Sequence, residues 1–93
     1  MTTIRKYLEA KLFSNGLWED QASAVVTAYE NSSGGQAMKG RMDDDISGYP
    51  SSMMIFLWIM VEAKAVEWID ANCPKHWARS MFTGVSQHRT GTV

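Results

Sequence analysis

The chain has few of the residues that build covalently stabilised or repetitive proteins. Its 93 residues include one cysteine, two prolines and seven glycines. A single thiol, at Cys73, cannot form a disulfide within the chain, and so little glycine and proline is incompatible with collagen or simple disorder. These shortages exclude a disulfide scaffold and a fibrous protein, and they favour a reducing compartment.

An excess of charge of either sign is also missing. Nine lysines and arginines against ten aspartates and glutamates give a formal net charge of −1. A dedicated nucleic-acid-binding protein needs a surplus of cations to displace the counterions of the phosphates. The charge balance therefore argues against nucleic acid as a partner.

No long apolar run is present. The longest, residues 53–61, has nine residues, whereas about 18 are needed to cross a bilayer. Near the N-terminus, Arg5 and Lys6 place charges where a secretory signal needs an apolar stretch. We therefore expect a cytoplasmic protein without a membrane partner.

What the chain does contain is a heavy apolar load for its size. Hydrophobic residues make up 45% of it, with four tryptophans and seven methionines. A domain of this length buries only about two-thirds of the surface of its unfolded chain. We expect one domain with more large apolar side chains than a monomer covers easily.

The apolar residues recur at helical spacing, which predicts an all-α fold. Asn15 and Gly16 should end the first helix, because both residues tolerate the left-handed conformation that ends helices, and Leu17 should seal the cap. The short connection predicts that the first two helices form an antiparallel hairpin. The domain should span residues 1–82 and be followed by a flexible tail over residues 83–93. We expect a bundle of about five helices, over residues 3–14, 18–31, 36–47, 50–72 and 74–81.

The helix expected over residues 50–72, the fourth, is apolar on every side in its first half. Its far side carries Met53, Phe56, Leu57 and Met60, where a soluble protein usually has polar residues. The other elements are short and can hardly enclose such a helix. The simplest explanation is a homo-oligomer, a dimer or higher, in which this helix packs against a second copy through those four residues.

Two motifs imitate known sites without completing them. Asp43 and Asp45 begin a pattern like a calcium loop, but position twelve, which must be an acid, is Met54. Cys73 at a helix start, with His76 three residues on, could form an activated thiolate, yet no third group orients them. We therefore predict no metal, no cofactor and no enzymatic activity, and a Cys/His enzyme ranks last among the hypotheses.

A diffuse group of cations and aromatic side chains flanks the two ends of the long helix. Such residues can hold a phosphate and stack a base, and self-association could bring the first cluster of one subunit near the second cluster of another. The alternative gives them ordinary structural roles, with Arg41 paired to an aspartate and Trp77 in the core. The candidate ligand-binding residues are Lys39, Arg41, Tyr49, His76, Trp77 and Arg79.

Residues 41–50, 57–58 and 65–82 together resemble a group of small uncharacterised phage and prophage proteins. The resemblance implies a phage setting and no particular activity. We expect a non-catalytic phage accessory protein that antagonises its host or the host's defence by binding, with an anionic small molecule such as a signalling nucleotide held between subunits. The alternative is an inhibitor that docks an apolar helix surface on a host or defence protein.

Overall fold

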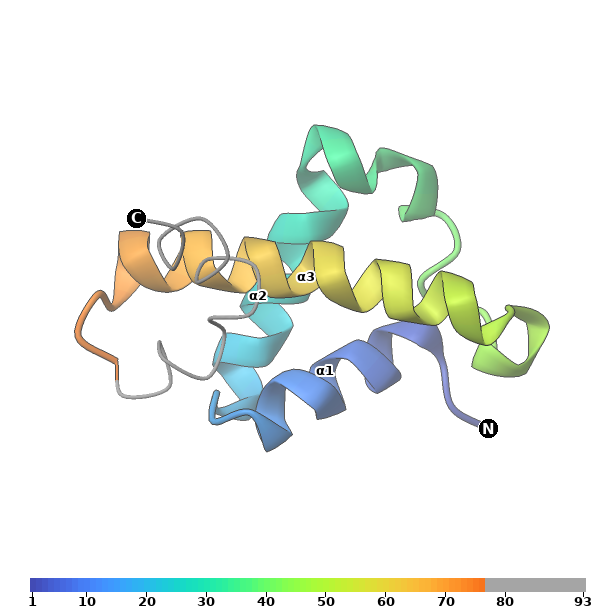
Figure 1. Ribbon diagram of the computed structural model, residues 1–93, viewed down its shortest axis with the longest axis horizontal. Helices are drawn as coiled ribbons and strands as arrows, with labels where there is room; N and C mark the ends of the chain where they lie inside the picture. Colours follow the sequence, from blue (N-terminus) through green and yellow to red (C-terminus); the bar gives the residue numbers. More distant parts are fainter. Residues whose placement is uncertain (77–93) are drawn as a thin grey trace.

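Three α-helices and two short 3-10 helices make up the computed structural model, which describes residues 1–76 (Figure 1). An isolated antiparallel bridge between Thr3 and Asp45 is the one β-type pairing among these residues. The all-α class that the periodicity predicts is confirmed for this part of the chain. The elements are α1 (Ile4–Ser14), α2 (Glu19–Asn31), η1 (Ser33–Met38), η2 (Ile46–Gly48) and α3 (Ser51–Asn72).

The end of α1 has the cap that the sequence predicts. Gly16 takes a positive φ of 112°. The N–H groups of Gly16 and Leu17 donate to the carbonyls of Phe13 (3.0 Å) and Leu12 (3.2 Å), respectively. This pair of bonds is a Schellman motif, whose usual hydrophobic contact falls between Leu12 and Leu17. Both leucines are buried, so core packing and hydrogen bonds fix the turn together.

The first two helices do not form the predicted antiparallel hairpin. α2 runs across α1 and α3 instead of alongside α1 (Figure 1). The reason lies in the turn: Leu17 enters the core, and Trp18 is extended, with φ −71° and ψ 162°. The side chain of Gln21 accepts the N–H of Trp18 at 3.0 Å, which starts α2 one residue later than predicted and in a new direction.

The prediction of a third helix over residues 36–47 is wrong. η1 and η2 take its place, with turns between them. The carbonyls of Met42 and Asp44 accept the N–H groups of Arg5 (2.8 Å) and Ile4 (3.0 Å). The first N–H groups of a helix have no partner within that helix. Here the loop supplies the carbonyl acceptors for the first N–H groups of α1. A continuous helix over residues 36–47 would use the carbonyl of Met42 internally, so the contact with α1 overrides the local periodicity.

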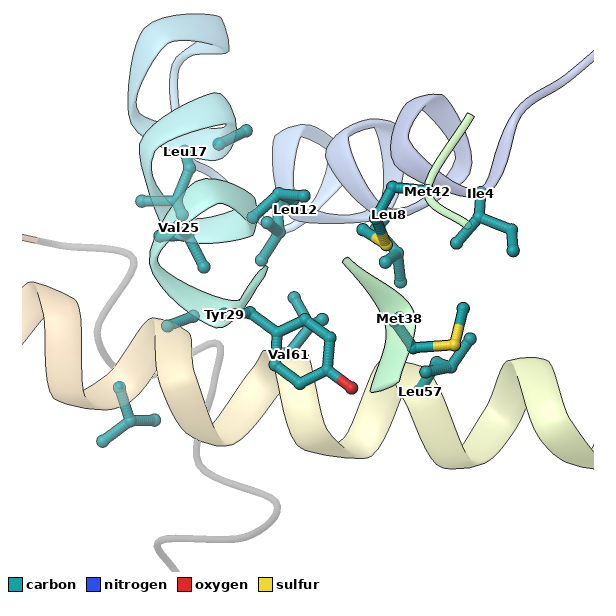
Figure 2. Packing of buried hydrophobic residues seen from close by; sticks show 14 of the residues in the cluster. Ile4, Leu8, Leu12, Leu17, Val25, Tyr29, Met38, Met42, Leu57 and Val61 are labelled. Atoms are coloured by element: carbon teal, nitrogen blue, oxygen red, sulfur yellow. The ribbon is translucent and has the colours of Figure 1, made fainter. Parts of the chain in front are cut away.

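α3 spans Ser51–Asn72, within one residue of the range predicted for the long helix, and Pro50 stands at its N-cap. One side of it packs on the other elements, and Figure 2 shows Leu57 and Val61 in the core with Tyr29 of α2. Although α3 has 22 residues, no helix in the described part of the chain is both long enough and apolar enough to cross a membrane. The buried residues of α3 are Met54, Leu57, Val61, Ala65, Val66 and Ile69.

The fifth predicted helix lies almost entirely outside the described residues. After α3 the chain makes a turn, in which the N–H of His76 donates to the carbonyl of Cys73 at 2.9 Å. The rest of that helix, the domain boundary at residue 82 and the predicted tail over residues 83–93 fall beyond residue 76. The expected five α-helices are thus not found within residues 1–76.

Arg5 joins three parts of the fold. Its guanidinium lies 2.5 Å from the carboxylate of Glu30 on α2 and 3.3 Å from that of Asp43 in the loop before η2. Glu30 is only 8% exposed, and it is the one buried charged residue among those described. A buried carboxylate without its partner is strongly destabilising, by about 3–5 kcal/mol. The ion pair therefore holds α1, α2 and the loop in one arrangement.

Gly35 is a position where the fold tolerates only glycine. A Cβ atom there would collide with the carbonyl group of Tyr29, a backbone group of α2. We expect Gly35→Ala to lower the free energy of unfolding by about 3 kcal/mol, because overpacking of a tight site costs roughly 1–3 kcal/mol. Urea denaturation followed by circular dichroism measures the loss.

Gly40→Ala is the matched control, because a Cβ atom at Gly40 meets nothing within 4 Å. Its free energy of unfolding should stay within about 0.5 kcal/mol of that of the wild type. Equal losses in the two variants would contradict the close approach of Gly35 to α2.

Candidate functional site

A group of apolar side chains on α3 remains exposed. Ile55, Phe56 and Ile59 are 59%, 60% and 44% exposed, and helical spacing places them on adjacent turns of one side of the helix. The opposite side, with Leu57 and Val61, is buried in the core. We call Ile55, Phe56 and Ile59 the outer face of α3. Large apolar side chains grouped in this way mark interaction sites.

The structure corrects the predicted self-association residues, of which only Phe56 belongs to the outer face. Leu57 is 2% exposed and lies in the core, where a second subunit cannot reach it. Met53 and Met60 are partly buried and pack against the core, and Met60 lies next to Gly34 of η1. A helix that is apolar on every side has no polar stripe to show which side faces inward. The crossing with α2 decides this instead.

Three of the candidate ligand-binding residues lie in the segment between η1 and α3. The Nζ of Lys39 donates to the Oδ1 of Asn31 at 3.0 Å, and the hydroxyl of Tyr49 donates to the carboxylate of Asp44 at 2.6 Å. The hydrogen bond to Asp44 raises the pKa of Tyr49, and the nearby Arg41 opposes this effect. Arg41 and Tyr49 are therefore neighbours on the surface, whereas Lys39 contacts α2.

Of the other three candidates only His76 is described, and it belongs to the opposite end of α3. His76 is half-buried just beyond this end, and Trp77 and Arg79 lie outside the described residues. The 22 residues of α3 span about 33 Å at 1.5 Å per residue. A single chain therefore does not bring His76 to the neighbourhood of Arg41 and Tyr49.

A cluster that the sequence analysis missed lies between α1 and α3. The Nζ of Lys11 is 5.0 Å from the centre of the Trp58 ring and 5.8 Å from that of Tyr7. Burial raises the pKa of Glu62 nearby, and the charge of Lys11 partly counteracts it. Both pairs, Tyr7 with Lys11 and Trp58 with Glu62, are spaced i, i+4 on their helices. That spacing is visible in the sequence, but only the packing of α1 against α3 joins the two pairs.

The acidic turn and the cysteine have structural contacts. The carboxylate of Asp45 accepts the N–H of Ser47 at 2.9 Å, and this hydrogen bond lowers the pKa of Asp45. Asp45 thereby caps η2. Cys73 is half-buried and packs against the core. Within residues 1–76, no three histidine, cysteine, aspartate or glutamate side chains are grouped so that they could hold a metal ion.

The outer face of α3 and the Arg41–Tyr49 neighbourhood are thus two surface features of the described residues with a chemistry of their own. No protein-family model matches the chain, and no curated protein or solved structure is significantly similar to it. What these surfaces can do follows from their side chains. Exposed apolar side chains bind apolar partners, and a cation beside an aromatic ring binds anions.

The half-buried Glu62 should make the stability of the protein depend on pH. Burial raises its pKa above the ordinary value, so the folded state holds the proton more tightly than the unfolded state does. The stability that Glu62 contributes is therefore fully present at low pH and is lost as the pH rises through the raised pKa. In Glu62→Gln this loss is absent.

Urea denaturation of both proteins between about pH 4 and pH 7 tests this expectation. Glu62→Gln should gain stability relative to the wild type as the pH rises. Glu67→Gln removes a carboxylate of α3 that is 72% exposed and is the control for the loss of one negative charge from this helix. If the difference in the free energy of unfolding between Glu62→Gln and the wild type stayed constant with pH, the raised pKa of Glu62 would be contradicted.

Proposed function

We propose that this protein acts by binding, as a homo-oligomer whose subunits meet through the outer face of α3. The exposure of Ile55, Phe56 and Ile59 on adjacent turns is the observation that supports this most directly. Single exposed apolar residues are ordinary, but three together on one rigid helix are not. Covering them removes apolar surface from water, which is the main driving force of association.

A second copy of the same chain is the simplest partner for this face. A two-fold axis brings the same patch of both subunits together, so one set of residues serves both. Residues 55–59 contain no charged side chain, and two copies can therefore approach without like-charge repulsion at the centre of the contact.

The proposed ligand is an anionic small molecule, such as a signalling nucleotide, held between subunits. Arg41 and Tyr49 offer a cation and an aromatic ring before the N-terminal end of α3, while His76 follows its C-terminal end. An antiparallel contact between two α3 helices brings opposite ends closer together, which one chain cannot do. The resemblance to small phage proteins makes the capture of a host defence signal, without catalysis, the proposed role.

The outer face of α3 also supports a second candidate function, the inhibition of a host or defence protein. An exposed helix that presents large apolar side chains on adjacent turns can lie in the groove of a partner. The aromatic ring of Phe56, which is 60% exposed, is the natural anchor of such a contact. The oligomeric state of the free protein separates the two candidate functions. In a homo-oligomer a second copy already covers the outer face of α3, whereas an inhibitor of this kind is a monomer with that face exposed.

Phe56→Glu should convert the oligomer into a monomer. The substitution places two like charges in the two-fold contact and removes the largest side chain of the outer face. Sedimentation velocity at micromolar concentration should show a dimer or higher oligomer for the wild type and a monomer for Phe56→Glu.

Thr27→Glu adds a charge at an exposed position of α2 and is the control, which should remain oligomeric. A wild-type protein that sediments as a monomer would contradict self-association and leave the inhibitor as the remaining candidate.

A captured nucleotide should stabilise the fold. A ligand present at about 100 times its Kd raises the free energy of unfolding by about 2.7 kcal/mol, so thermal unfolding against a panel of cyclic and linear nucleotides identifies it by a raised Tm. Arg41→Ala should abolish the shift. Lys75→Ala, which removes an exposed cation beyond α3, should retain it. No shift of the wild-type Tm with any nucleotide would count against a nucleotide ligand.

A further inference from the structure

A second exposed surface lies at the corner where α1 ends and α2 begins. The hollows there each have Phe13 in their lining, and we take them together as one region of the surface. We call this the corner groove. The side chains of the corner groove that carry its chemistry are Lys6, Glu9, Phe13, Trp18, Glu19 and Asp20.

Two aromatic rings of the corner groove are exposed. Phe13 is 51% exposed and Trp18 is 67% exposed. Their backbone is nevertheless held firmly, because Gly16 and Leu17 form the Schellman turn and Gln21 accepts the N–H of Trp18. A fixed backbone keeps the two rings at one place on the surface, so a partner can contact them without a rearrangement of the turn.

The walls of the corner groove are acidic. Glu9, Glu19 and Asp20 line it together with a single amine, that of Lys6. None of the three carboxylates takes part in an ion pair with another of the described residues. The groove therefore offers negative charge beside aromatic surface, and a cation complements both.

The chain itself shows how such a cation is held. Lys11 lies over the rings of Tyr7 and Trp58, whereas within residues 1–76 no cation lies over the ring of Phe13 or Trp18. A guanidinium group can stack its flat face on an aromatic ring while its N–H edge donates to carboxylates. An ammonium group is a point charge and does not combine the two contacts in this way.

We propose that the corner groove binds an arginine side chain from a basic segment of a partner protein. The guanidinium stacks on Trp18 and donates hydrogen bonds to Glu19 and Asp20, while Phe13 contacts the aliphatic part of the side chain. This binding does not depend on self-association through α3, because the two surfaces share no residue.

The probes for this proposal are two capped pentapeptides that differ only in carrying two arginines or two lysines. In a titration followed by NMR, the arginine peptide should shift the Trp18 indole and the backbone amides of Phe13, Glu19 and Asp20. It should bind at least about five-fold more tightly than the lysine peptide, because both cations can lie over the ring but only the planar guanidinium stacks on it while its N–H edge donates to the carboxylates. Equal affinities, or shifts spread over the whole surface, would overturn the proposal.

Variants separate stacking from simple charge attraction. Trp18→Ala should weaken binding of the arginine peptide by about five-fold or more, and it leaves the core intact because the side chain is mostly exposed. Glu19→Gln should weaken binding, whereas Glu67→Gln removes the same charge from α3 and should not. Equal effects of the two glutamine variants would overturn the proposal. The proposal would also be overturned if Trp18→Ala abolished self-association and Phe56→Glu did not, because a second copy of the chain would then occupy the corner groove.

Discussion

The crossing of α2 over α3 decides which side of the long helix is buried. Val25, Val26 and Tyr29 of α2 join Leu57 and Val61 of α3 in one core. A helix of 22 residues with apolar side chains all around its first half needs more cover than so short a chain can supply. The outer face of α3 is therefore a consequence of this crossing, and so is the surface proposed for self-association.

A second constraint holds the segment between α2 and α3. The N-terminal N–H groups of α1 take the carbonyls of Met42 and Asp44 as partners, and Arg5 pairs with Glu30 and Asp43. Buried or unpaired polar groups are costly, so these contacts outweigh a third helix. They also fix where Arg41 and Tyr49 emerge, just before the N-terminal end of α3, and so determine that any anion site built from them and His76 needs two subunits.

The two exposed surfaces differ in chemistry, which suits them to different partners. The outer face of α3 is apolar and carries no charge, like the core of many interfaces between identical subunits. The corner groove between α1 and α2 combines two aromatic rings with three carboxylates and fits a cationic side chain. The two proposals therefore assign assembly and partner binding to different surfaces of the protein.

The sequence by itself determined the helices whose signals are local. The Asn15–Gly16 cap sealed by Leu17, the start of α3 within one residue of Pro50 and the helical class depend on residues close together in the chain, and all are observed. Contacts between distant residues decided the rest. The turns of the 36–47 segment, the burial of Leu57 and the meeting of Tyr7 and Lys11 with Trp58 and Glu62 depend on how helices cross. No periodicity encodes a crossing, because the free energy that selects it comes from packing of the whole core.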